Sequence, residues 1–361
     1  MPATISPVDA ALTSASPGPG TLKGRIVLLY ALLIGFNAGA WLWALVAFHH
    51  HPVLLGTAFL AYAFGLRHAV DADHIASIDN VTRKLMQQGK RPVSVGFFFS
   101  LGHSTVVFGL SVVIVLTSVA IKEHFGSFEA IGGLIGTSVS AFFLLAIAAA
   151  NMLVLASVYR TFRHVKRGGQ FVDEDLDLIL SQRGFFGRLF RNFFRLIEHG
   201  WQMYPIGFLF GLGFDTATEV GILGISATEA TRGLSVWSIL VFPTLFTAGM
   251  ALIDSTDSIL MLGAYGWAFV KPIRKLYYNL TITFVSVLVA LLIGGIEVLG
   301  LIGDHFKIQG AVWDLIGYLN SNFGLVGVVI IGVFVVSWIV SFLIYRINRY
   351  DEIEVNTDPV N

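Results

Sequence analysis

The chain has 361 residues, of which 55% are apolar and only 13% are charged. Soluble domains carry about a quarter charged residues, so this composition indicates a protein that lies in a membrane. Equal numbers of basic and acidic residues exclude the positive excess expected of a nucleic-acid-binding protein. The absence of cysteine excludes disulfides and thiolate metal sites.

The chain begins with a polar stretch rich in Ala, Ser, Pro and Thr, which predicts a disordered cytoplasmic tail over residues 1–24. Eight apolar segments follow, each long enough to cross a bilayer core. They predict an all-α, polytopic transmembrane domain over 25–345 and a second cytoplasmic tail over 346–361. The segments are 25–48, 53–76, 93–121, 129–158, 204–226, 236–265, 276–303 and 323–345.

The connections between these segments differ in basic residues. Lys and Arg crowd 83–91, 160–195 and 271–275, whereas the opposite connections hold only Lys122, Arg232 and Lys307. Positive residues stay on the cytoplasmic side of a membrane. We therefore expect both termini in the cytoplasm and the chain in the cytoplasmic (inner) membrane.

The long connection 159–203 contains an amphipathic stretch at 183–201, with phenylalanines on one side and arginines on the other. Such a helix is typical of one lying on the inner leaflet, although packing against the cytosolic face of the bundle remains an alternative. The two halves of the chain also echo each other, since 64–66 resembles 210–212 and 99–102 resembles 246–249. Inverted repeats of this kind place a transport site between the halves.

Ionisable residues within spans are costly and usually functional. The second span ends with Arg67, His68, Asp71, Asp73 and His74. On an unbroken helix, His68, Asp71 and His74 share a face and Asp73 points away from it. Asp73 would then pair with Arg67 or hold one of the metal ligands in place without binding the ion. Imidazole together with carboxylate suits nickel, cobalt, zinc or iron, so the pattern predicts a transition-metal site, with an interrupted helix as an alternative.

Three further spans carry buried acids or histidine. His103 lies in the third span, where binding an ion and linking two helices are about equally expected. Asp215 and Glu219 are four residues apart in the fifth span, and Asp254 and Asp257 are three apart in the sixth. Each pair lies on one helix face, which favours a functional role for these carboxylates.

Other polar residues have plainer interpretations. Asp79 lies near the cytoplasmic end of its segment, where a cap or a partner for Arg83 is expected. Asn37 fits helix packing as well as function. The histidine run 49–51 is expected in an exposed outer loop, and Glu297 has no evident partner in the sequence.

Four motifs resemble those of the nickel/cobalt transporter (NiCoT) family. Residues 67–75 read RHAVDADHI and resemble the second-span motif; 99–107 resemble the third-span motif, 212–219 the fifth and 249–257 the sixth. The resemblance covers all but the N-terminal tail and is closest to the high-affinity nickel permeases that serve hydrogenase. It implies eight spans, cytoplasmic termini and secondary uptake of Ni²⁺ or Co²⁺.

The resemblance also implies roles for single residues. The family's His-x4-Asp-His core is met by His68, Asp73 and His74, so Asp73 is kept as a site residue although an unbroken helix points it away. Val70 stands where the family has Val or Phe, and Val is typical of the nickel permeases.

These observations predict a secondary transporter for high-affinity uptake of Ni²⁺, with Co²⁺ as a further substrate. The metal is the cargo of a chain that needs no cofactor, and no ATP-binding motif or ATPase subunit is indicated. The lipid bilayer and the ion are the expected partners. The expected ligands are His68, Asp71, Asp73, His74, His103, Asp215, Glu219, Asp254 and Asp257, with Asn37, Arg67, Val70, Ser104, Thr216 and Met250 around them.

Two other interpretations use the same residues. An intramembrane metal-dependent hydrolase would activate water on a histidine-bound metal. A metal exporter on the same scaffold would confer resistance. The carboxylates are spread over several spans, which fits an ion path better than the compact catalytic site of a hydrolase. The long connection holds only His164 and His199, whereas exporters typically have a histidine-rich loop, so export is also disfavoured.

Overall fold

The computed structural model describes residues 21–116, 125–167, 197–212, 217–268, 272–348 and 350. All regular elements in these ranges are helical, which confirms the expected all-α fold. The helices are α2 (Leu22–Phe48), α3 (Pro52–His68), α4 (Ala72–Gln87), α5 (Val95–Leu116), α6 (Phe125–Lys166), the 3-10 helix η1 (Gly200–Gln202), α9 (Met203–Gly211), α10 (Ala217–Thr231), α11 (Val236–Ile239), α12 (Val241–Ala268), α13 (Pro272–Phe306), α14 (Ala311–Ser321) and α15 (Phe323–Ile347).

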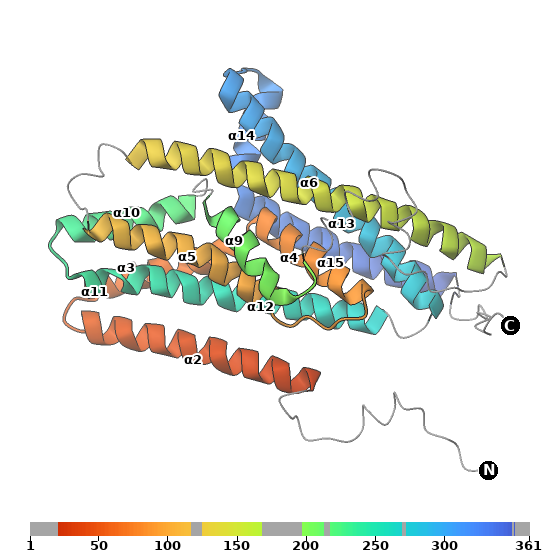
Figure 1. The fold of residues 1–361 in the computed structure, drawn as a ribbon, viewed down its shortest axis with the longest axis horizontal. Coiled ribbons are helices and arrows are strands. Elements are labelled where there is room, and N and C mark those ends of the chain that lie inside the picture. The colour runs from red at the N-terminus through yellow and green to blue at the C-terminus, as the bar shows by residue number, and fades with distance from the viewer. Residues whose placement is uncertain are drawn as a thin grey trace, which may run out of the picture.

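The long helices lie side by side in one bundle, with α2 along one edge and α6 along the opposite one (Figure 1). Among the described residues, six helices are long and apolar enough to cross a membrane, or seven if α3 and α4 form one bent span. The predicted segment 204–226 is divided into α9 and α10, and residues 213–216 between them lie outside the described part. A multi-pass membrane fold is therefore confirmed, and the predicted count of eight segments is approximate.

The second predicted span is not the continuous segment 53–76. The helix stops after His68 and restarts at Ala72, with a bend of 51° between α3 and α4. Helix α4 then continues to Gln87, well into what the sequence placed as a connection. The alternative prediction of an interrupted helix is therefore confirmed. The arrangement of His68, Asp71 and His74 on one face of a continuous helix is wrong.

Helix α4 is polar and nevertheless buried in the middle of the bundle, because its side chains are paired with neighbouring helices. Arg83 donates to Thr283 Oγ1 at 2.9 Å and to Asn80 Oδ1 at 2.9 Å. Asp79 accepts hydrogen bonds from Tyr265 and from Ser286, the latter at 2.7 Å. Asp79 thus joins α4 to α12 and α13, and these contacts satisfy polar groups whose burial would otherwise be costly.

The predicted connections hold more helix than expected. Helix α6 continues to Lys166, so the long connection begins later than residue 159. Helix α14 lies between the seventh and eighth predicted spans and packs beside the C-terminal part of α13, projecting from the bundle in Figure 1. Residues 183–196 of the amphipathic stretch lie outside the described residues, so its place on the membrane stays a prediction, as does the inverted repeat.

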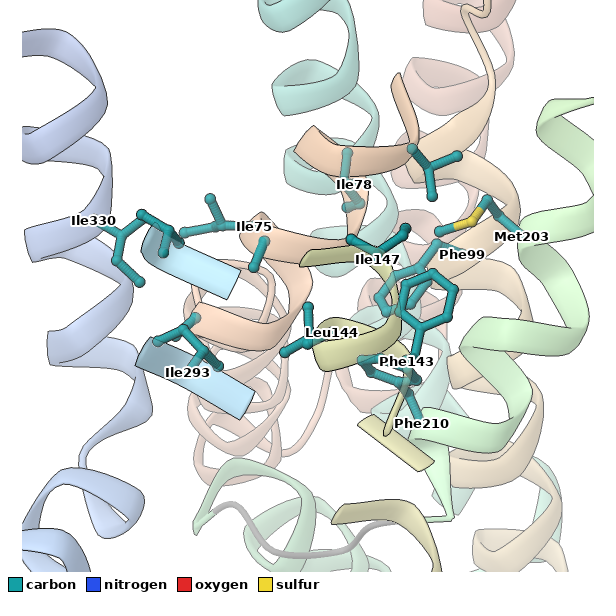
Figure 2. Close-up of a cluster of buried hydrophobic side chains, with 14 of the residues drawn as sticks. Ile75, Ile78, Phe99, Phe143, Leu144, Ile147, Met203, Phe210, Ile293 and Ile330 are labelled. Atoms are coloured by element: carbon teal, nitrogen blue, oxygen red, sulfur yellow. The ribbon is translucent and has the colours of Figure 1, made fainter. Parts of the chain in front are cut away.

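A large apolar cluster joins α4 to α5, α6, α9, α13 and α15. Phe210 meets Phe99 and Phe143 edge to face, with Ile147 beside Phe99 and with Ile75 on the side toward Ile330 (Figure 2). The outer surfaces are also apolar. Leu42 on α2 and Val328 on α15 are more than half exposed. Such exposed apolar side chains fit helices that face lipid tails.

Candidate metal-binding site

The break between α3 and α4 places two site residues at a helix end. Asp71 stands at the N-cap of α4, where a carboxylate normally accepts a hydrogen bond from the first turn of its helix. Its side chain makes no such bond. Instead Asp71 Oδ2 lies 2.8 Å from His68 Nδ1, so the break directs the carboxylate toward the histidine that ends α3.

Three histidines meet behind this break. His68 ends α3, His74 lies in the first turn of α4 and His103 comes from the middle of α5. One ring nitrogen from each lies within 4.8 Å of the others. Their side chains are only 2%, 0% and 2% exposed, respectively. Three imidazoles with converging nitrogen atoms in a dry interior form an arrangement typical of a metal site.

Two of the ring nitrogens are spaced for a shared ion. His68 Nε2 and His103 Nε2 lie 2.9 Å apart. Metal–imidazole bonds of about 2.1 Å place two ligand nitrogens at right angles about 3.0 Å apart. His74 Nε2 is buried and has no hydrogen-bond partner among the described residues. A metal ion at the centre of the cluster would satisfy this nitrogen.

Carboxylates surround the histidines on two sides. Glu219, in the first turn of α10, lies 2.8 Å from His103 Nε2 and 3.9 Å from His68 Nε2 through its Oε1 atom. Asp254 on α12 lies 3.2 Å from His74 Nδ1. A carboxylate on the far ring nitrogen of a metal-binding histidine fixes the ring and its tautomer. Asp254 thus holds His74 with Nε2 toward the cluster.

Aromatic side chains complete the walls. Phe99 meets the His74 ring edge to face, with centroids 4.8 Å apart at 90°. Phe246 lies 5.6 Å from the His68 ring, centroid to centroid. These rings limit the movement of the imidazoles and keep the site dry, which strengthens electrostatic interactions within it.

Four predicted residues lie near the cluster without joining it. Asp73 is partly buried beside His74 and is not among the residues whose ligand atoms converge. Asp257 is partly buried, and its Oδ2 has no hydrogen-bond partner in the described ranges. Ser104 is buried next to His103. Val70 lies in the break itself, where its N–H donates to the Arg67 carbonyl at 3.0 Å.

Three others have packing or surface positions. Asn37 donates to the carbonyls of Leu33 and Ala248, at 2.9 and 3.2 Å, and so joins α2 to α12. Met250 is fully buried in an apolar cluster. Arg67 is exposed, and no ion pair to Asp73 is seen in the described part of the chain. Asp215 and Thr216 lie outside the described residues, so their predicted roles are not tested.

Thr218 was not among the expected site residues. Its hydroxyl lies 3.2 Å from His68 Nδ1, beside Asp71. Thr218 directly precedes Glu219 within the fifth-span motif, so its position next to a predicted ligand was the available signal. The contact itself depends on how α10 packs against α3, which local sequence does not show.

The fold and the cluster together define a polytopic membrane protein with a buried site of nitrogen and oxygen ligands suited to a first-row transition metal. Comparison with known protein families shows which family the chain belongs to. The profile described as "High-affinity nickel-transport protein" (NicO) matches residues 54–344. The chain belongs to this NicO family of transport proteins.

Individual relatives agree with this assignment. A "High-affinity nickel transport protein" of Cupriavidus necator is 61% identical, over 93% of this chain and 96% of that protein. The "Hydrogenase nickel incorporation protein HupN" of Bradyrhizobium diazoefficiens is 52% identical over 92% and 86%. The "Cobalt transport protein NhlF" of Rhodococcus rhodochrous is 39% identical over 88% and 89%. No solved structure gives a significant match.

Proposed function

We propose that this chain takes up Ni²⁺ across the cytoplasmic membrane, with Co²⁺ as a second substrate, and that the ion binds between His68, His74 and His103. The convergence of these three buried imidazoles carries the proposal. The nickel and cobalt names of the relatives favour the same substrates. The metal is the cargo, and the histidines are its temporary ligands.

The surrounding carboxylates suit a transported dication. Glu219 and Asp71 lie against His103 and His68, and their negative charge lowers the cost of moving a dication out of water. Asp254 acts through His74, and Asp73 and Asp257 are proposed to line the path on either side. Asp215 and Thr216 are kept as further candidates from the fifth-span motif.

The orientation follows from the basic residues. We place both termini in the cytoplasm, because the Lys- and Arg-rich connections then lie inside. The membrane potential draws a cation inward at about 2.3 kcal/mol per charge per 100 mV. A dication gains twice this energy, so uptake without an ATPase subunit is feasible.

The hydrolase interpretation loses its support, because the family and its named relatives are transport proteins. The exporter interpretation differs from the proposed function only in the direction in which the metal ion crosses the membrane. Cells that express an exporter would retain less metal than control cells, whereas cells that express an importer would accumulate more.

Radioactive nickel offered at nanomolar concentration to cells without their own nickel uptake tests the proposal. Cells that express the chain should accumulate the isotope well above cells with an empty vector, and excess unlabelled Ni²⁺ should suppress uptake more than equal Co²⁺. Accumulation at or below the empty-vector level would contradict the importer function.

A further inference from the structure

A second polar region lies beside the histidine site. A cavity of about 280 Å³ is lined by the C-terminal part of α13, by α14, by the start of α15 and by Thr137 of α6. Its polar lining comes mainly from Glu297, Asp304, Asn320 and Ser321. The described residues that line it include no Lys, Arg or His, so both charges at the cavity are negative.

The two carboxylates lie at different depths. Glu297 and Asp304 are seven residues apart and therefore share one face of α13. Asp304 is exposed, whereas Glu297 is only 1% exposed and accepts a hydrogen bond of 2.6 Å from Ser140 on α6. In the proposed topology this end of α13 faces the outside. The cavity thus has an acidic mouth and a buried carboxylate at its inner end.

The inner end of the cavity adjoins the histidine site through the first turn of α15. Phe323 lines the cavity, and the next residue, Gly324, faces the break between α3 and α4. A Cβ atom added at Gly324 would lie 3.0 Å from Asp71 Oδ1 and 3.0 Å from Arg67 Nη2. Gly324 therefore packs closely against Asp71 and Arg67, and a larger side chain would press on both.

The two carboxylate oxygens of Asp71 face different neighbours. Its Oδ2 contacts His68, while its Oδ1 is buried, has no hydrogen-bond partner among the described residues and lies toward Gly324. A buried carboxylate oxygen without a donor is costly. A cation that passes the Arg67 guanidinium from the cavity would meet this oxygen before His68.

We infer that the cavity is an outer loading site, in which Glu297 and Asp304 hold a hydrated divalent transition-metal cation before it passes Gly324 to Asp71 and His68. Six waters occupy about 180 Å³ at about 30 Å³ each, so the cavity has room for the ion with its hydration shell. The inference rests on the proposed uptake function. Arg67 also lies beside Gly324, and because its side chain is exposed it has room to turn aside as the ion passes.

Equilibrium binding of Ni²⁺ to purified full-length protein tests the site itself. In a His68→Ala/His103→Ala background, a weaker Ni²⁺ site should remain and should be lost when Glu297→Gln is added. The matched control is Asp314→Asn, an exposed carboxylate on α14 that does not line the cavity. Equal residual binding with and without Glu297→Gln, in protein that elutes as a single species, would overturn the inference.

Failure of the loading site remains distinguishable from failure of the histidine site. If the double histidine variant binds Ni²⁺ as tightly as the wild type, the proposed function fails, while the effect of Glu297→Gln is still measured. Uptake kinetics give a second test. Glu297→Gln should raise the KM for Ni²⁺ about tenfold with little change in maximal rate, whereas an unchanged KM would contradict loading at Glu297.

The proposed route of the ion past Gly324 is tested separately. Gly324→Ala should lower the maximal uptake rate because the added methyl group narrows the route past Asp71. The control is Gly332→Ala on the same helix, where an added Cβ meets nothing within 4 Å. Equal uptake by the two variants would show that the ion does not pass Gly324.

Discussion

Replacement of His103 by alanine is expected to reduce Ni²⁺ uptake at nanomolar concentration by more than about 100-fold. Loss of a residue that only supports a metal ligand costs about 10- to 100-fold, and His103 is placed as a ligand itself. Its Nε2 lies 2.9 Å from His68 Nε2 and 2.8 Å from Glu219. The substitution removes one of the three converging nitrogens and the nearer of the two imidazoles beside Glu219.

The appropriate control is His305→Ala. His305 is an exposed histidine near the end of α13, remote from the cluster in sequence and not among its ligand atoms. Uptake by this variant should stay within about twofold of wild type, since exposed surface substitutions usually have small effects. If His103→Ala transports normally at similar membrane abundance, His103 does not bind the ion.

Replacement of Asp254 by alanine should weaken nickel binding by about 10- to 100-fold, although Asp254 is not expected to touch the ion. The carboxylate lies 3.2 Å from His74 Nδ1 and so determines which ring nitrogen faces the cluster. Without it, His74 can turn or change tautomer. Isothermal titration of purified protein with Ni²⁺ measures this loss directly.

A conservative variant separates orientation from charge. The side-chain oxygen of Asp254→Asn can still accept from His74 Nδ1, so this variant should recover most of the affinity if orientation is the role. Asp254→Asn as weak as Asp254→Ala would indicate that the negative charge itself is required. Full affinity in Asp254→Ala would exclude both roles.

The sequence was sufficient to predict an all-helical membrane protein, because long uncharged apolar segments have few other stable environments. It also indicated the residue types at the site. His68, Asp71 and His74 were expected close together, and they are close. The reason differs, however, since the helix is interrupted at Ala69–Asp71 and Asp71 approaches His68 from the cap of the next helix.

The convergence of separate helices could not be read from local pattern. The pattern around His103 was as consistent with a link between helices as with ion binding, and it did not show that α5 brings His103 to His68. The contact of Glu219 with His103 depends on how α10 packs against α5 and α3. Helical spacing identifies residues on one face of a helix, and it carries no information on which helix that face meets.

Buried polar residues outside the motifs were the hardest to interpret. Glu297 had no partner in the sequence, because Ser140 lies on another helix and 157 positions away. Asp79 was expected to cap a helix or meet Arg83. Arg83 does lie close enough to attract it, and its hydrogen bonds come from Tyr265 and Ser286 on α12 and α13. Helix α14 was missed because its 11 residues are too few to resemble a span.

X-ray absorption at the nickel edge, on purified protein loaded with an equimolar amount of Ni²⁺, tests the central claim most directly. The histidine cluster predicts nitrogen and oxygen ligands at about 2.1 Å and the multiple scattering typical of imidazole. That scattering should weaken in His74→Ala, since one of the three converging histidines is then lost. A spectrum with oxygen ligands alone, unchanged in His74→Ala, would contradict the assignment of the ion to His68, His74 and His103.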